Sequence, residues 1–241
     1  MNKKICAIAI VIFMLMPLLA VATQRVQAQS TAVSLIDQSV IEQTHTYFYA
    51  DVGATINLTL YVQDVSSLWS WKVNVTWDNS MLQLAPTDNV TEGPFLSNNG
   101  ASSTLFMEAP PTPGNIPELS STLLENTSAT GSGDLVYLAF TVQNLGDTTI
   151  NITGTRLLNP SGTDITTIAP ITKTLIIHGP GDVNGEGTVD IYDAISLAEA
   201  FGSTPGSANW NPAADLMNDG IIDIYDAIIV ATYFGLHYNY A

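Results

Sequence analysis

This chain of 241 residues contains very little cysteine and few positively charged residues. Its single cysteine, Cys6, lies in the apolar N-terminal run, so a mature chain cleaved after that run holds no disulfide. Only 6 Lys and Arg residues stand against 22 Asp and Glu residues, which gives a formal net charge of −16. This acidic balance argues against nucleic acid and anionic membrane surfaces as partners.

Long apolar runs are also scarce. The sequence has one, and it lies at the N-terminus. Lys3 and Lys4 precede it, Ile5–Val21 forms it, and Val26–Ala28 supplies a small-residue cleavage site. This pattern is typical of a secretory signal peptide, so we expect residues 1–28 to be removed on export. An uncleaved anchor is the alternative. After cleavage we expect no membrane insertion, and a protein that is secreted or held at the cell surface.

The most informative feature is a 22-residue unit written twice near the C-terminus. Residues 181–202 read GDVNGEGTVDIYDAISLAEAFG and residues 214–235 read ADLMNDGIIDIYDAIIVATYFG, an offset of 33 residues with 11 identical positions. Each copy begins with a 12-residue loop that has Gly at position 6 and oxygen-bearing residues at nearly every ligand position. Ca²⁺ takes six to eight oxygen ligands from loops of this kind. The repeat therefore predicts two calcium sites.

The predicted ligands follow the loop numbering. In the first loop they are Asp182, Asn184, Glu186, the Thr188 carbonyl, Asp190 and Asp193; in the second they are Asp215, Asp219, the Ile221 carbonyl, Asp223 and Asp226. Met217 stands at position 3 of the second loop, where a thioether is a poor ligand for Ca²⁺. We therefore expect a weaker second site, with Asn218 or water as the substitute ligand. The alternatives are an acidic turn that binds nothing, or one degenerate loop beside one loop that binds calcium.

A short helix is predicted after each loop. In each repeat, apolar residues are spaced as on one face of a helix, and a glycine that should end the helix follows them: Gly202 in the first repeat and Gly235 in the second. These sets are Ile191, Ala194, Ile195, Ala198 and Phe201, and Ile224, Ala227, Ile228, Ala231 and Phe234. We expect the two apolar faces to pack against each other. Tyr225, Ile229 and Tyr233 should lie away from that inner face, either as an interface or packed on the rest of the chain.

Residues 181–235 resemble a type I dockerin, with two loop–helix repeats that carry Asp at position 12. The resemblance implies a calcium-dependent fold that binds a cohesin domain. In that family positions 10 and 11 of each loop help to choose the partner, and here they are Ile191-Tyr192 and Ile224-Tyr225. Because both repeats carry the same pair, the face is expected to dock in either orientation. Ile229 and Tyr233 complete the predicted partner-binding set.

Residues 31–178 have a hydrophobic period of two, which predicts a β-sandwich. Apolar and polar residues alternate over 56–62, 69–78 and 136–142, while prolines mark 109–118 as a loop or a strand interruption. Trp69, Trp71 and Trp77 share the parity of the apolar residues, so we expect them in the core. Stacking of these rings on sugar is the alternative.

The sandwich also resembles a known family. The order VGATINLTLYVQDV, WSWKVNVTWDNSMLQL, GSGDLVYLAFTVQN and RLLNPSGTDI is similar to that of a cohesin domain, a jelly-roll sandwich related to cellulose-binding modules. The resemblance implies protein or polysaccharide binding. The expected organisation is a signal peptide (1–28), a cohesin-like β-sandwich (31–178) and a small α-helical dockerin (179–241), mainly β in class.

Five N-x-[ST] sequons mark candidate glycosylation sites in an exported chain. They are Asn57, Asn74, Asn89, Asn126 and Asn151.

No candidate nucleophile lies at a sequence spacing from a candidate general base that is typical of an active site, so we expect that the protein is not an enzyme. The predicted function is a secreted, non-catalytic adaptor that binds a cohesin of another protein, or of another copy of itself, in an extracellular assembly related to polysaccharide breakdown. Alternatives are a carbohydrate-binding protein that its dockerin only tethers, and a structural surface-layer component.

Overall fold

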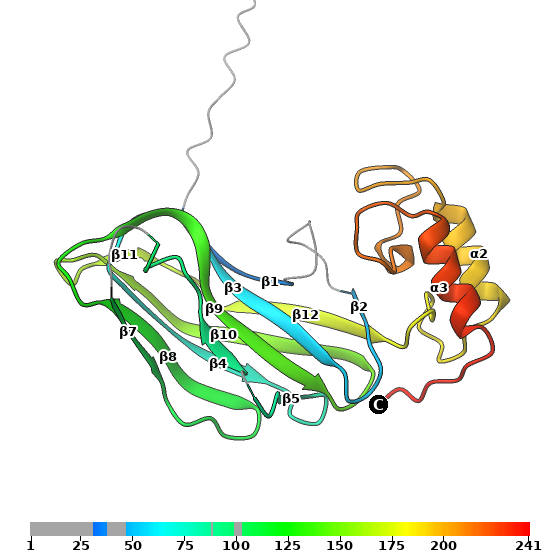
Figure 1. Cartoon of the computed structure of the whole chain (residues 1–241), viewed down its shortest axis with the longest axis horizontal. Coiled ribbons are helices and arrows are strands. Elements are labelled where there is room, and N and C mark those ends of the chain that lie inside the picture. The colour runs from blue at the N-terminus through cyan, green and yellow to red at the C-terminus, as the bar shows by residue number, and fades with distance from the viewer. Residues whose placement is uncertain (1–30, 38–46, 88, 99–102) are drawn as a thin grey trace, which may run out of the picture.

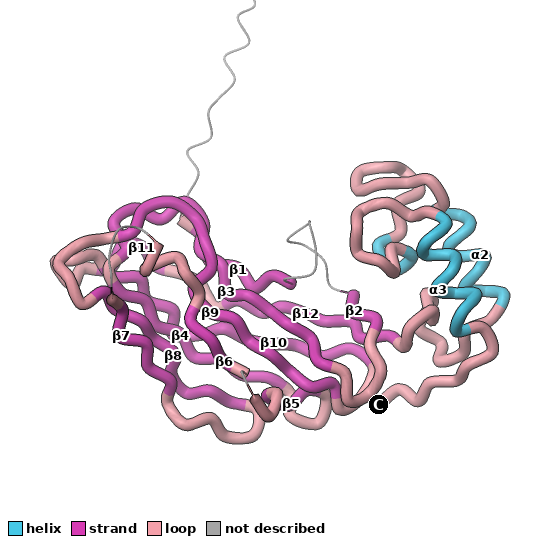
Figure 2. Tube along the Cα trace, in the orientation of Figure 1, coloured by secondary structure: helices cyan, strands magenta, loops and turns pink. Residues whose placement is uncertain are grey.

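The computed structural model describes residues 31–37, 47–87, 89–98 and 103–241. The predicted signal peptide lies outside the described residues. Figure 1 shows a β-sandwich with a small helical unit at one end, and the chain is mainly β, as expected from the sequence (Figure 2). We call the helical part, residues 179–241, the C-terminal unit.

The sandwich is built from two sheets. The first contains β1 (Ala32–Asp37), β3 (Thr55–Leu68), β5 (Leu82–Leu84), β6 (Val90–Glu92) and β9 (Ala129–Val142); the second contains β2 (Tyr47–Tyr49), β4 (Ser70–Trp77), β7 (Thr104–Glu108), β8 (Asn115–Leu123), β10 (Gly146–Leu158), β11 (Asp164–Thr167) and β12 (Ile171–His178). The strand orders are β1-β3-β9-β5, with β6 also on β9, and β2-β12-β10-β4-β8-β7, with β11 on β10. β2 and β12 pair in parallel, whereas the other pairs are antiparallel.

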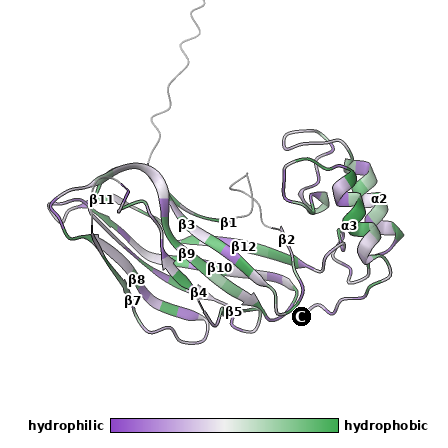
Figure 3. Cartoon of the chain, in the orientation of Figure 1, coloured by the Kyte–Doolittle hydropathy of each residue, from purple (hydrophilic) through white to green (hydrophobic). Residues whose placement is uncertain are grey.

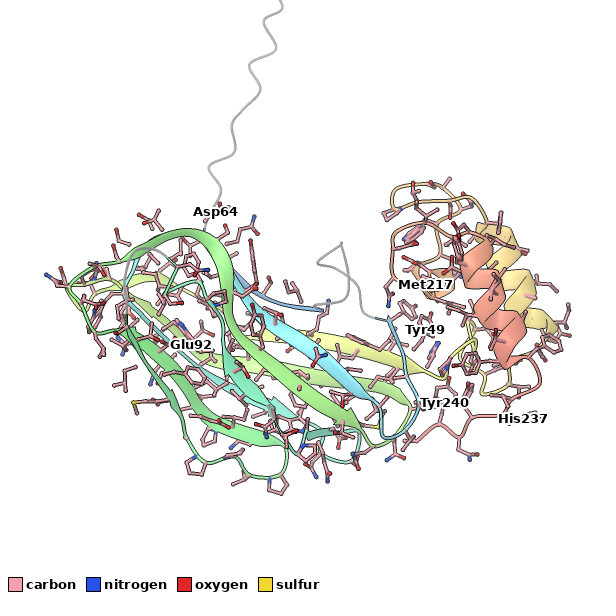
Figure 4. The ribbon with its side chains drawn as sticks, in the orientation of Figure 1. Tyr49, Asp64, Glu92, Met217, His237 and Tyr240 are labelled. Atoms are coloured by element: carbon pink, nitrogen blue, oxygen red, sulfur yellow. The ribbon has the colours of Figure 1, made fainter. Side chains whose placement is uncertain are left out.

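The core lies between the sheets, where the predicted alternation places one apolar row of each strand. Leu58, Leu60, Val73 and Phe140 are fully buried on these inner faces. Among the tryptophans, Trp71 and Trp77 are buried and Trp69 is partly buried against the same cluster, so their predicted core position is confirmed. Glu92 of β6 links the two sheets, because it accepts hydrogen bonds from the hydroxyls of Thr104 and Ser121 (Figure 4).

The proline-rich stretch is only partly a loop. β8 begins at Asn115, so Pro117 lies inside a strand that the sequence did not predict there. The pairing register shifts at this point, since Val73 opposes Leu119 but Val75 opposes Ile116. The extra residue forms a bulge, where a proline without an N–H removes no ladder hydrogen bond.

The C-terminal unit contains α2 (Ile191–Ala200), a single 3₁₀ turn η2 (Pro212–Ala214) and α3 (Ile224–Tyr233). Both helices start with a capping box, in which Asp190 and Asp223 are the N-caps and Asp193 and Asp226 the third helical residues. No helix among the described residues is long and apolar enough to cross a membrane.

The prediction of which residues of the two helices pack inward is wrong. Ile191, Ile195, Phe201 and their repeats Ile224, Ile228 and Phe234 are exposed, while Leu197, Ala200 and Val230 are buried. The physical reason is that Asp193 and Asp226 bond to their own loops, which turns the side of each helix carrying Leu197 or Val230 toward the loops. Ile229 and Tyr233 are half-buried against the core of this unit, which agrees with the second of the two expectations for them, packing on the rest of the chain, and not with a place at an interface.

The buried tryptophan gives a test of the core. Replacing Trp71, which is 1% exposed, by alanine removes a large ring between the sheets and should lower the free energy of unfolding by about 3–5 kcal/mol. The measurement is urea unfolding followed by circular dichroism. Leu124→Ala is the control, since Leu124 is 64% exposed and should change stability by less than about 0.5 kcal/mol. Equal effects of the two substitutions would contradict this assignment of the core.

Candidate calcium loops and docking surface

The first loop is organised around two buried carboxylates. Asp182 accepts the backbone N–H groups of Gly185 and Gly187 at 2.9 Å each, on Oδ1 and Oδ2. Asp193 accepts those of Asn184 at 3.1 Å and Asp190 at 2.8 Å. Gly187 has a φ of +90°, the left-handed conformation that the turn at position 6 requires. Positions 1 and 12 thus hold the loop closed.

The second loop repeats nearly every one of these contacts. Asp215 accepts from Asp219 at 3.2 Å and from Gly220 at 3.0 Å, and Asp226 accepts from Met217 at 3.0 Å and from Asp223 at 2.8 Å. Met217 therefore contributes its backbone N–H to the loop, and its side chain is 52% exposed (Figure 4). The departure at position 3 leaves the loop geometry intact and removes only an oxygen ligand.

The chemistry of both loops suits a hard cation. Asp182, Asp193 and Asp226 are 0% exposed and Asp215 is 2% exposed, yet residues 181–241 contain no Lys or Arg. Buried carboxylates without a countercharge are costly, and Ca²⁺ supplies that charge with oxygen coordination. Burial raises the pKa of Asp215 and Asp226 above the ordinary value; backbone N–H donors oppose this shift in part, and repulsion from neighbouring carboxylates adds to it.

Three of the remaining predicted ligands lie at the loop surface, while Thr188, Asp190 and Asp223 are half-buried. Asn184, Glu186 and Asp219 are exposed, and the side chains of Asn184 and Asp219 accept the N–H groups two residues ahead, at 2.9 and 3.0 Å. Within the described ranges no three His, Cys, Asp or Glu side chains converge as a closed cage. The buried pair of each loop is in place, and the outer ligands would have to turn inward onto a bound ion.

The helices present an exposed apolar surface, which we call the helix face. Its residues are Ile191, Tyr192, Ile195, Phe201, Ile224, Tyr225, Ile228 and Phe234, each 46–62% exposed. A groove of about 160 Å³ between the helices is lined by Ala194, Leu197, Ala227, Val230, Ala231 and Phe234, and Figure 3 shows that much of α3 is hydrophobic. Contiguous exposed apolar surface of this kind marks an interaction site.

The structure brings together four of the six predicted partner-binding residues. Ile191, Tyr192, Ile224 and Tyr225 share the helix face, whereas Ile229 and Tyr233 pack toward the core of the unit. Sequence reasoning missed Ile195, Phe201, Ile228 and Phe234 because their apolar periodicity resembles that of a buried face. A cue was available, since an Asp at loop position 12 must turn toward the loop and so fixes the helix rotation.

Other predicted sites lie on the sandwich. Of the five sequons, Asn57 and Asn126 are exposed, and Asn74, Asn89 and Asn151 are half-buried. Edge strand β7 adds two exposed apolar residues, Leu105 and Met107. They flank the outer surface of the second sheet, where Lys72 of β4 and Glu118 of β8 form an ion pair at 3.6 Å.

Two protein-family models match the chain. Residues 48–177 match the cohesin domain and residues 180–235 match the dockerin type I domain. No curated protein matches the sequence. Similar solved structures include a non-cellulosomal cohesin from Archaeoglobus fulgidus (16% identity, 61% of this chain and 91% of that one, TM-score 0.44). Others are a type II cohesin domain from the cellulosome of Acetivibrio cellulolyticus (12%, 61% and 95%, 0.49) and a cohesin module from a family 33 glycoside hydrolase of Clostridium perfringens (12%, 61% and 98%, 0.45).

The raised pKa values of Asp215 and Asp226 predict an unusual pH dependence without calcium. A carboxyl whose pKa rises on folding stabilises the fold below its unfolded pKa, and this contribution is lost as the pH rises through the folded pKa. In EDTA the C-terminal unit should therefore melt at a higher temperature at pH 4.5 than at pH 7. Circular dichroism at 222 nm measures this, because the α-helices belong to that unit. Saturating calcium is the control and should remove the difference; equal melting temperatures in EDTA would contradict the assignment.

Proposed function

This chain belongs to the cohesin family, whose domain model matches more than half of it, and we propose that it is a secreted, non-catalytic adaptor. Cohesin and type I dockerin are interaction modules without catalysis of their own, and type I dockerins bind calcium. A chain that carries both has a role in cohesin–dockerin assembly. Secretion, an extracellular or cell-surface location and a link to polysaccharide breakdown are part of the proposal.

The observation that carries the proposal is the exposed helix face. Both tyrosines at loop position 11, Tyr192 and Tyr225, stand on it with about 60% of their surface in solvent. The contacts found between the described sandwich residues and the dockerin are made by Tyr47, Tyr49 and His178 and by the C-terminal tail, and none of them involves a residue of the helix face. The face is therefore free to receive a cohesin, from another protein or from another copy of this chain.

Calcium is proposed to hold that face in shape. The first site uses Asp182, Asn184, Glu186, Thr188, Asp190 and Asp193, and the second uses Asp215, Asp219, Ile221, Asp223 and Asp226. Each ion neutralises a buried pair of carboxylates directly beneath the start of a helix, so the two ions set the rotation of α2 and α3. The second site is the weaker one, because Met217 supplies no oxygen.

The cohesin module is proposed to receive a dockerin on the outer surface of its second sheet. The exposed side chains of Leu105 and Met107, beside the Lys72–Glu118 ion pair, give that surface an apolar margin next to a charged centre. This combination is usual for protein interfaces. The carbohydrate-binding alternative lacks comparable support, since Trp71 and Trp77 are buried and Trp69 and Trp210 are half-buried.

Calcium titration tests the metal part of the proposal. Calorimetry on the chain from residue 29 onward should detect two sites of unequal affinity. Met217→Asn restores an oxygen at position 3 and should tighten the weaker site on the order of tenfold. Met107→Asn is the matched control, because both methionines are 52% exposed, and it should leave both affinities unchanged. Detection of a single site whose affinity does not change in Met217→Asn would contradict calcium binding by the second loop.

Partner binding tests the near-symmetry of the helix face. Tyr192→Ala and Tyr225→Ala should each change the affinity for a cohesin by no more than about tenfold, because the repeat that is still intact can occupy the centre of the interface. The double variant should lose binding by more than about 100-fold, the loss expected for two interface tyrosines. The probes are a panel of purified cohesin domains and the 31–178 sandwich of this chain. If one single substitution abolishes binding to every cohesin that binds the wild type, docking has one orientation.

A further inference from the structure

The C-terminal tail joins the two modules. After α3, residues 236–241 run back along the first calcium loop, where the N–H of Val189 bonds to the carbonyl of Leu236 at 3.0 Å and that of Tyr238 to the carbonyl of Gly187 at 2.7 Å. The tail then reaches the sandwich, and the N–H of Ala241 bonds to the carbonyl of Leu145 at 3.1 Å. One short segment thus contacts a metal loop and a sandwich strand connection together.

Tyr240 connects these two contacts through its hydroxyl. It donates to Oδ2 of Asp182 at 2.6 Å and accepts the N–H of Gly179 at 3.1 Å. Oδ2 of Asp182 also receives the N–H of Gly187, so this oxygen has two donors. Oδ1 has one, the N–H of Gly185. The tyrosine therefore orients the carboxylate and leaves Oδ1 the more available oxygen for a cation.

The second loop lacks this arrangement. Asp215 occupies the same position as Asp182, but the donors found to its carboxylate are the backbone N–H groups of Asp219 and Gly220. Tyr49 of β2 donates to the carbonyl of Ala213, two residues before Asp215, and not to that carboxylate. The two repeats match in sequence and backbone contacts, and a tyrosine bond to the first ligand distinguishes them.

Aromatic packing holds Tyr240 in place. The ring of His178, the last residue of β12, makes edge contacts with Tyr47, Tyr49 and Tyr240 at centroid distances of 5.9, 6.2 and 5.8 Å. In Figure 4, Tyr49 and Tyr240 lie between the sandwich and the dockerin.

The joint has no spare room. A Cβ added at Gly179 would stand 2.2 Å from the ring of Tyr238, and one added at Gly185 would stand 2.5 Å from Nε2 of His178. The contact of Gly185 with His178 lies between the first loop and the sandwich, and the contact of Gly179 with Tyr238 lies between the start of the C-terminal unit and its tail. The first loop, the tail and the end of β12 are therefore packed closely together at this point.

We infer that Tyr240 is a positioning residue for the first calcium site, and that through it calcium binding and seating of the dockerin on the sandwich are one coupled event. The inference rests on the proposed binding of calcium to the first loop. Outer residues that orient a metal ligand commonly change affinity by 10–100-fold. Because coupling between two sites is reciprocal, loss of the tail bond weakens calcium, and loss of calcium loosens the tail.

The test compares the chain from residue 29 onward with its Tyr240→Phe variant, which keeps the ring and removes the hydroxyl. Calorimetry should find the first-site affinity for Ca²⁺ lowered by about tenfold and the second unchanged, with hydrogen exchange of the two loop peptides assigning the sites. Exchange of residues 236–241 should be faster in the variant than in the wild type, and faster in EDTA than in calcium. Tyr61→Phe, on β3, is the matched control, since the Tyr61 hydroxyl makes no bond to either loop among those found.

The outcomes separate the coupling from the calcium site. Two unchanged affinities for Tyr240→Phe, or tail exchange in the wild type that is the same in calcium and in EDTA, would overturn the coupling and leave calcium binding standing. Absence of calcium binding to the wild-type first loop would overturn both. An equal loss at both sites would indicate general destabilisation and also contradict a positioning role.

Discussion

Four buried carboxylates in a domain without a single Lys or Arg are the constraint on which the C-terminal unit depends. Asp182, Asp193, Asp215 and Asp226 have almost no exposed surface, and backbone N–H groups compensate only part of their charge. Each carboxylate accepts donors of its own loop, so the loop can close only around them. A divalent cation completes this balance, and for that reason metal binding and folding of the dockerin are linked.

The same constraint places the docking surface. Position 12 of each loop is also the third residue of the following helix, and its carboxylate must face the loop. Once Asp193 and Asp226 are turned inward, residues 191, 195, 224 and 228 must point outward whatever their hydropathy. An exposed row of isoleucines is unfavourable for an isolated domain and is explained by a partner that covers it. The proposed calcium loops and the proposed docking surface are thus two consequences of one arrangement.

Much of this could be predicted from the sequence, because local patterns determine it. Alternation in β3, β4 and β9 predicts the sandwich, and the duplicated loop predicts the metal sites and the helix starts. The rotation of the helices was predicted wrongly, since an apolar stripe looks the same whether it packs inside a chain or against a partner. The tail could not be predicted at all, because nothing in the order of residues 236–241 indicates that Tyr240 returns to Asp182, 58 positions earlier.

The charge of the two modules also bears on which partner can bind the helix face. Both modules are acidic: the sandwich has three basic residues, Lys72, Arg156 and Lys173, while the dockerin has none. Lys72 and Arg156 are already paired with Glu118 and Asp164 on the outer surface of the second sheet. Docking one copy on another would bring two negative surfaces together, at distances shorter than the screening length of about 8 Å at physiological salt. Charge therefore favours a cohesin of another protein, with basic residues around its apolar centre, over a second copy of this chain.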